Sequence, residues 1–388
     1  RIILVGNEKG VGVNLEGITH ATDELVLTAD GKIRIKGRVS SDKDIRIASG
    51  GDSVEISGSL AAAKVADVAA AKSLALKSEP GARALLYADD VRVSAESLHN
   101  GDGRIESGTS LAVATCSDIT NAGALVSGGD AVLGAGGVVA NAGQVQAGGS
   151  LEIKGKTVVN SGRMFSIEAV KIHSAGDIVN SCEIMSKKST VLEATATISN
   201  TGVIRTEGQT TVSVGSLKNA GGSIEARDVM VLDAAGHIAN TGLLSAERVA
   251  VINAASLSNA GGSILSQGDL DLGVTGVLDN SGVLYSGASG LIRAGSMRND
   301  PAGQALSQGD LTLDLGADLE NFGVLNAGNY LYLRSGDSLF NLGAGILAQV
   351  GLELVAQGDI TNSGGIQSGG TGLFQAGRMF LNSGDVLA

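Results

Sequence analysis

Asparagine recurs through most of this chain at a nearly constant interval. Fifteen asparagines span 282 residues in 14 steps, so the mean period is 20.1 residues, and single steps range from 19 to 22 residues. Twelve of them begin an Asn-x-Gly triplet. They are Asn100, Asn121, Asn141, Asn160, Asn180, Asn200, Asn219, Asn240, Asn259, Asn280, Asn299, Asn321, Asn341, Asn362 and Asn382. A period near 20 that tolerates small slips is typical of a solenoid, in which each repeat forms one coil.

Composition supports this interpretation and removes two alternatives. The chain has 58 Gly but only 2 Pro, which excludes collagen. Hydrophobic residues make up 43%, too many for a disordered chain. Because only 4 Tyr, 5 Phe and no Trp are present, the core has to be built from Val, Ile, Leu and Ala.

Within each repeat, apolar residues alternate over short stretches between glycine turns. In the repeat that begins at Asn321, Leu331 and Leu333 form such a pair. The same pair recurs at Leu151/Ile153, Val170/Ile172, Val212/Val214, Val249/Val251, Leu270/Leu272, Leu311/Leu313 and Leu352/Leu354. Alternation with a period of two predicts strands, and parallel strands are joined by right-handed crossovers. The sequence therefore predicts an all-β, right-handed parallel β-helix of about 19 coils with a repeat of about 20 residues.

Two regions differ in regularity. Residues 100–388 carry the asparagine repeats, whereas residues 1–99 are less regular but keep the alternating pairs. These pairs are Leu25/Leu27, Ile45/Ile47, Val54/Ile56, Leu74/Leu76 and Val91/Val93. The Ala-rich stretch between Leu60 and Leu76 could form a helix on propensity alone. The 20-residue spacing from Ile56 to Leu76 favours another coil, so we expect one continuous solenoid.

The asparagine ladder is expected to be structural. Asparagine tolerates the left-handed conformation and glycine accepts positive φ, so Asn-x-Gly can form a corner. Stacked identical amides can also hydrogen-bond from coil to coil. A ligand-binding groove of amides is the alternative, but a binding site has no need of fifteen copies.

Residues that could perform chemistry are scattered. The histidines His20, His99, His173 and His237 fall in separate coils, and the Gly-Asp pairs at Asp52, Asp130, Asp269, Asp310 and Asp359 are expected to be solvated corners. Cys116 and Cys182 lie three repeats apart, roughly 14 Å at the strand spacing, which is too far for a disulfide. The sequence therefore predicts no enzyme, no catalytic residue, no metal site and no cofactor.

Charge and hydropathy limit the partners. The formal net charge is −12, and no basic stripe with interleaved aromatic residues occurs, so nucleic acid is not an expected partner. No apolar run approaches the ~20 residues of a membrane span. The candidate contact residues are Tyr330 and Tyr332, which flank Leu331 on the outward face of one strand, and Tyr285, two coils earlier. Such rings can anchor a sugar or a protein, or pack on their own neighbours.

The repeats resemble those of the filamentous haemagglutinin family, which includes the stalks of contact-dependent growth inhibition toxins and other two-partner secretion exoproteins. Phrases such as Asn200-Thr-Gly-Val-Ile and Asn219-Ala-Gly-Gly-Ser-Ile-Glu-Ala carry the resemblance, which covers residues 100–388. The opening stretch from Ile3 to Asn14 resembles the segment that follows the secretion domain in such proteins. No Asn-Pro dipeptide of that domain is present, so we expect the secretion domain upstream of Arg1.

The resemblance implies a role in virulence or competition at the surface of a Gram-negative bacterium. The parent protein would be secreted through an outer-membrane partner that recognises a region outside this segment. The segment would then be a structural extracellular stalk that projects an adhesive or toxin domain. As an alternative, the shaft would itself be an adhesin that binds host glycans, a cell-surface receptor or a neighbouring bacterial cell.

Overall fold

The computed structural model describes residues 1–7, 10–81 and 83–387. It contains two compact units, Arg1–Val191 (unit 1) and Leu192–Ala388 (unit 2), which we describe separately. The described residues form strands and turns without a helix, and the strands stack as parallel coils with a spacing of about 20 residues, about 19 turns in all. The predicted parallel β-solenoid is therefore confirmed, and its right-handed sense stays a prediction. The opening stretch Ile3–Asn14 includes residues 8 and 9, which lie outside the described residues.

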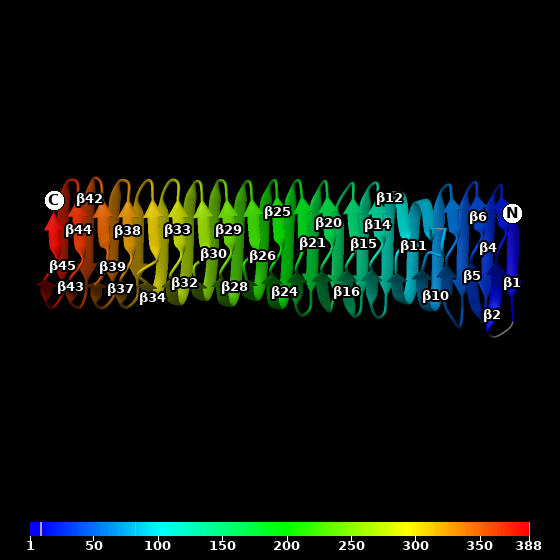
Figure 1. The fold of residues 1–388 in the computed structure, drawn as a ribbon, viewed down its shortest axis with the longest axis horizontal. Coiled ribbons are helices and arrows are strands. Elements are labelled where there is room, and N and C mark those ends of the chain that lie inside the picture. Colours follow the sequence, from blue (N-terminus) through cyan, green and yellow to red (C-terminus); the bar gives the residue numbers. More distant parts are fainter. Residues whose placement is uncertain (8–9, 82, 388) are drawn as a thin grey trace. The chain divides into compact units, whose positions relative to one another are not determined.

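In each unit the strands form three stacks, which we call faces A, B and C (Figure 1). Face A of unit 1 contains β3 (Ile18–Ala21), β6 (Arg38–Ser41), β9 (Ser59–Ala62), the starts of β11 (Leu85–Asn100) and β12 (Arg104–Thr115), β14 (Ala124–Ser127), β17 (Gln144–Ala147), β20 (Arg163–Ser166) and β23 (Glu183–Ser186). Face B contains β1 (Ile2–Gly6), β4 (Glu24–Ala29), β7 (Asp44–Ser49), the start of β10 (Val65–Leu76), the middle of β11, the end of β12, β15 (Asp130–Ala135), β18 (Leu151–Gly155) and β21 (Ala169–Ser174). Face C contains β2 (Val11–Leu15), β5 (Lys32–Ile35), β8 (Val54–Ile56), the ends of β10 and β11, β13 (Ile119–Asn121), β16 (Val138–Asn141), β19 (Thr157–Asn160) and β22 (Ile178–Asn180).

Unit 2 repeats this arrangement, and β24 (Ser189–Asn200) contains the boundary between the units. Its face A contains β25 (Val203–Thr206), β27 (Ser223–Ala226), β29 (Leu243–Ala246), β31 (Ser263–Ser266), β33 (Val283–Ser286), β35 (Gln304–Ser307), β38 (Val324–Ala327), β41 (Gly345–Ala348), β44 (Gly365–Ser368) and β47 (Asp385–Leu387). Long bent strands supply both face B and face C: β26 (Gln209–Asn219), β28 (Val229–Asn240), β30 (Val249–Asn259), β32 (Asp269–Asn280) and β34 (Gly290–Asn299). Face B continues in β36 (Leu311–Leu315), β39 (Tyr330–Ser335), β42 (Gly351–Ala356) and β45 (Thr371–Ala376), and face C in β37 (Leu319–Asn321), β40 (Leu339–Asn341), β43 (Ile360–Asn362) and β46 (Phe380–Asn382).

Columns of aliphatic side chains fill the interior of each unit. The buried residues of one coil stand in register with those of the next, as in Leu133, Ile153 and Ile172. The Ala-rich stretch is a coil and not a helix, because β9 and β10 place Leu60, Ala66 and Val68 in this core. Inward and outward side chains thus alternate along most strands, and the alternation is interrupted where the long strands bend, as in β10 and β28.

One predicted core pair is wrong. Val249 and Val251 face outward in β30, whereas Ala250 and Ile252 are buried. The stretch Val-Ala-Val-Ile allows either phase of alternation, since it contains apolar residues at every position. Register with the buried Met230 and Leu270 places Ala250 inside and fixes the phase.

Candidate functional site

The asparagines at the end of face C bond directly to one another. In unit 1 each Nδ2 donates to the Oδ1 of the asparagine in the next coil over 2.7–2.9 Å, from Asn100 to Asn180. In unit 2 nine such bonds of 2.6–2.9 Å run from Asn200 to Asn382. The asparagines up to Asn362 are buried. Their amides therefore face other amides of the same ladder and are not presented to a ligand in solvent.

Most of these amides also bind the backbone. Asn219 Nδ2, for example, donates to the carbonyl oxygen of Leu243, 3.2 Å away in the following coil. Asn240 and Asn259 repeat this contact with Ser263 and Val283. A single asparagine thus joins the side chain and the backbone of the neighbouring coil.

The predicted left-handed corner at Asn-x-Gly is wrong. Each asparagine ends a strand, and no residue other than glycine has a positive φ in the part of the chain that the structure describes. Of the Asn-x-Gly glycines described, only Gly221 and Gly261 have a positive φ. Both belong to Asn-Ala-Gly-Gly turns, where an additional glycine follows.

Most of these glycines are required for a different reason, which is close packing between coils. A Cβ on Gly143 would lie 2.0 Å from the carbonyl oxygen of Gly123, and a Cβ on Gly282 would lie 2.0 Å from that of Gly262. The same approach recurs at Gly323 and Gly364, each 2.1 Å from a glycine carbonyl one coil earlier. Since these contacts are with backbone atoms, a side chain at these turns would have to separate the coils.

The ladder of unit 1 starts at an apolar column. Ile35, Ile56 and Leu76 occupy the register position that Asn100 occupies in the next coil. Asn100 Oδ1 is buried and has no hydrogen-bond partner, because Leu76 cannot donate to it. The change from an apolar column to an amide column therefore leaves one acceptor unsatisfied at its start.

The Gly-Asp turns are more than solvated corners. The Oδ1 atom accepts a hydrogen bond from a backbone N–H one coil later at Asp130 (from Ser150, 2.7 Å), Asp269 (from Ser289, 3.0 Å), Asp310 (from Tyr330, 3.1 Å) and Asp359 (from Met379, 3.1 Å). Asp52 Oδ1 accepts from the adjacent Ser53 N–H, 2.9 Å away, and forms an ion pair with Lys72 of the next coil over 3.5 Å. The five predicted corners thus form a second set of bonds between coils, four through a backbone N–H and one through a lysine.

The candidate contact tyrosines do not form one site. Tyr330 and Tyr332 lie on face B and their rings stack, with centroids 5.9 Å apart and an interplanar angle of 20°. Tyr330 is 41% exposed, but a Cβ on Gly351 of the next coil would lie 2.7 Å from its ring, so the ring covers that glycine. Tyr285 lies on face A, and its hydroxyl accepts a hydrogen bond of 2.7 Å from Gln308.

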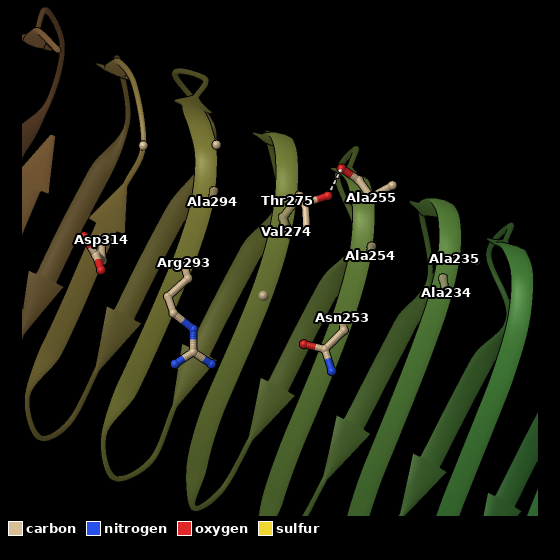
Figure 2. Close-up of a pocket in the computed structure, with 13 residues that line it drawn as sticks. Ala234, Ala235, Asn253, Ala254, Ala255, Val274, Thr275, Arg293, Ala294 and Asp314 are labelled. Carbon is tan, nitrogen blue, oxygen red and sulfur yellow. Dashed lines mark hydrogen bonds between the residues drawn. The ribbon is translucent and has the colours of Figure 1, made fainter. Parts of the chain in front are cut away.

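A groove of about 650 Å³ follows the bend between faces B and C of unit 2. Figure 2 shows small residues such as Ala254 along it, with Asn253, Arg293 and Asp314 in a row beside them. Asn253 already donates to Asp233 over 2.7 Å, and Arg293 donates to Asp271 over 2.6 Å. The sequence did not predict this groove, because it arises from small residues at the bend of four long strands.

Neither a metal site nor a membrane helix is found in residues 1–7, 10–81 and 83–387. No group of three or more His, Cys, Asp or Glu side chains could hold a metal ion there, and no helix is long and apolar enough to cross a membrane. His20, His99 and His237 each contact a hydroxyl in the next coil over 2.9–3.0 Å. Cys116 and Cys182 are free thiols.

A cluster of charges on face C of unit 1 includes Glu55, which binds Lys32 over 2.5 Å and Arg34 over 2.9 Å. Glu55 and Arg34 border a hollow of about 590 Å³ that is also lined by Lys77 and Pro80. Burial acts to raise the pKa of Glu55, but the hydrogen bonds and charges of the two cations outweigh it, so the pKa lies below its ordinary value. The folded state therefore favours the charged carboxylate.

Glu55→Gln is expected to destabilise unit 1 at neutral pH by no more than about 1 kcal/mol, since Glu55 is 39% exposed and solvent screens the pairs. A lowered folded pKa contributes stability above the unfolded pKa of about 4.3, and this contribution is lost as the pH falls through the folded pKa. Urea unfolding across this pH range should show the two proteins converging in acid. A difference that persists or grows in acid would contradict this account.

These features define a class of protein, the parallel β-solenoid whose coils are joined by repeated side-chain ladders. The family model of the haemagglutinin repeat matches residues 3–181, 189–247, 246–296 and 288–386. The chain therefore belongs to the haemagglutinin repeat family. Comparison with curated proteins and with solved structures finds no significant match.

Proposed function

We propose that this chain is a structural stalk segment of a large, secreted surface protein. The observation that carries the proposal is that the polar groups which recur from coil to coil bind neighbouring coils. The amides of the asparagine ladder, the Gly-Asp carboxylates and the ion pairs of Asp271 and Glu55 all do so. Such groups join successive coils into a regular scaffold. Because they are already bonded to one another, few of them are free to bind a ligand.

Family membership supports the finer parts of the proposal. The parent protein leaves a Gram-negative cell by two-partner secretion, through an outer-membrane partner that recognises a region outside this segment. Residues 1–99 and 100–388 form one continuous solenoid at the bacterial surface, and the segment has no enzymatic activity, cofactor or nucleic-acid partner. The domain that it projects is an adhesin or a toxin, as in contact-dependent growth inhibition.

The alternative is an adhesin whose shaft binds host glycans or a receptor. The groove of unit 2 is the observation in its favour, because it is long, open and edged by Asn253, Arg293 and Asp314. The engagement of Asn253 and Arg293 by Asp233 and Asp271 weighs against it, since a ligand would have to displace bonds already made.

Binding of the labelled chain to epithelial cells and to sibling bacteria, with and without enzymatic glycan removal, separates the two functions. A stalk segment is expected to show no saturable binding to either cell type. Saturable binding that glycan removal abolishes would overturn the stalk proposal in favour of the adhesin. Arg293→Ala and the pair Tyr330→Ala/Tyr332→Ala would then distinguish the groove from the exposed rings.

A further test uses the repeat. Deletion of residues 219–258 from the parent protein joins Lys218 to Asn259 and preserves the register of the ladder. A stalk is expected to tolerate this change, so secretion and the terminal activity should remain while the reach shortens. Deletion of residues 219–248 shifts the register and serves as the disruptive control. Loss of the terminal activity after the in-register deletion alone would contradict a spacer role.

A further inference from the structure

Face A of unit 2 carries an uncharged strip over six consecutive strands, β29, β31, β33, β35, β38 and β41. One outward row contains Leu265, Tyr285, Leu306 and Leu347, in register through Asn326. The other row contains Leu243, Val283 and Val324. The remaining outward positions of these strands are serine, glutamine, asparagine and glycine.

These apolar side chains are half-buried by their neighbours but still reach the surface. Four-residue strands at a spacing of about 4.8 Å give the strip an area of about 380 Å². This footprint includes the serine, glutamine, asparagine and glycine positions, so the apolar area is smaller, and the lack of charge is what distinguishes the strip.

The lack of charge is specific to this part of the face. The same two rows carry the ion pair Arg205–Glu225 in the first coils of unit 2, and Arg163–Glu183 on face A of unit 1. On face B of unit 2, charges continue beside the strip, as in Arg293–Asp271 and Arg334–Glu353. In the face A strands of unit 2, charged residues thus stop at Glu225 and do not return before Asp385 in β47.

We propose that the uncharged strip is a lateral contact with a second copy of this chain. Two copies of a chain with a net charge of −12 repel each other, and a face without charges is the one on which they can approach with least repulsion and no desolvation of ions. A pleated sheet face also matches an identical face, since sheets pack about 10 Å apart through their outward side chains.

The area sets the strength of the contact. Two strips bury about 750 Å² together, below the ~1,200 Å² of stable complexes, so the association is weak between free molecules. It becomes effective when many copies are held side by side on one surface, because the later contacts are then effectively intramolecular. The inference rests on the surface display in the proposed function, and it holds for a spacer and for an adhesin alike.

Sedimentation velocity of the purified chain from micromolar to submillimolar concentration tests the proposal. The weight-average sedimentation coefficient is expected to rise with concentration, and to rise more at higher salt because salt screens the net charge. Leu265→Glu/Leu306→Glu places two charges on the strip and is expected to raise the dissociation constant at least ~10-fold. A matched control, Val251→Glu/Leu291→Glu, places the same charges two coils apart on face B and should associate as the parent chain does.

Each other outcome overturns the proposal. Circular dichroism first establishes that both variants remain folded, as expected for outward positions. A monomer at all concentrations, or association that survives Leu265→Glu/Leu306→Glu, would place the contact elsewhere. An equal loss of association in both variants would indicate that the added negative charge weakens it by general repulsion and not through the strip. Capture of an uncharged polysaccharide by a monomeric chain, abolished by the same variant, would replace the second copy with a glycan.

Discussion

Replacement of Asn240 with leucine is expected to destabilise unit 2 by about 2–6 kcal/mol, because it leaves two buried polar groups without their partners. One N–H of Asn219 Nδ2 loses its acceptor at 2.8 Å, while the bond to the Leu243 carbonyl remains, and Asn259 Oδ1 loses its donor at 2.8 Å. Leucine itself fits such a column, since Leu76 occupies the equivalent register position beside Asn100. The expected effect therefore comes from the hydrogen bonds and not from the shape of the side chain.

Hydrogen exchange is the appropriate measurement, since a long repeat array does not unfold in one step. Amides of β28 and β30 should lose protection first, and the urea midpoint should fall. Asn382→Leu is the control, because Asn382 is exposed and water can replace its bond to Asn362. Equal effects at the two positions would show that burial of the ladder does not matter.

Much of the fold could be predicted from the sequence, because a solenoid repeats the same local structure in every coil. The alternation at Leu151/Ile153 or Leu311/Leu313 fixed which side chains enter the core, and the structure buries them all. The prediction failed at Val249/Val251, where apolar residues at four successive positions leave the phase to the neighbouring coils. Register between coils is a tertiary property, and a single repeat does not encode it.

The surface was harder to predict than the core. The Gly-Asp turns looked like solvated corners because the sequence does not show that an N–H twenty residues later, as at Ser150, lies within reach of Asp130. The uncharged strip became visible only when the pairing placed Leu265, Tyr285 and Leu306 in one row. A signal existed in the 20-residue spacing of these residues, but only the strand boundaries show that all three face outward.

The glycines of the Asn-x-Gly turns illustrate the same limit. Sequence alone suggested that they supply a positive φ, and this is the case at Gly221 and Gly261. At most of the other turns, the reason is the distance to the backbone of the preceding coil, which depends on how closely two coils stack. Glycine is thus required at equivalent positions for two different reasons, a positive φ or a close approach of two backbones. Substitutions at the two kinds of turn can separate these reasons.

Gly282→Ala is expected to destabilise unit 2 by at least about 3 kcal/mol, because overpacking against a backbone atom cannot be relieved by a rotamer change. The new Cβ would lie 2.0 Å from the Gly262 carbonyl oxygen and 2.8 Å from Asn259 Nδ2, so relief of the clash also strains the ladder. Gly261→Ala meets no atom within 4 Å but requires a φ of +72°, for which an alanine costs about 1–2 kcal/mol. Gly316→Ala meets its nearest atom at 3.5 Å, and its free energy of unfolding should stay within about 0.5 kcal/mol of that of the parent.

The urea midpoint should be lowest for Gly282→Ala, intermediate for Gly261→Ala and highest for Gly316→Ala. For Gly282→Ala, the loss of hydrogen-exchange protection should be centred on β30 and β32. An equal loss for Gly261→Ala and Gly282→Ala would mean that backbone conformation, and not the approach of successive coils, requires glycine at these turns.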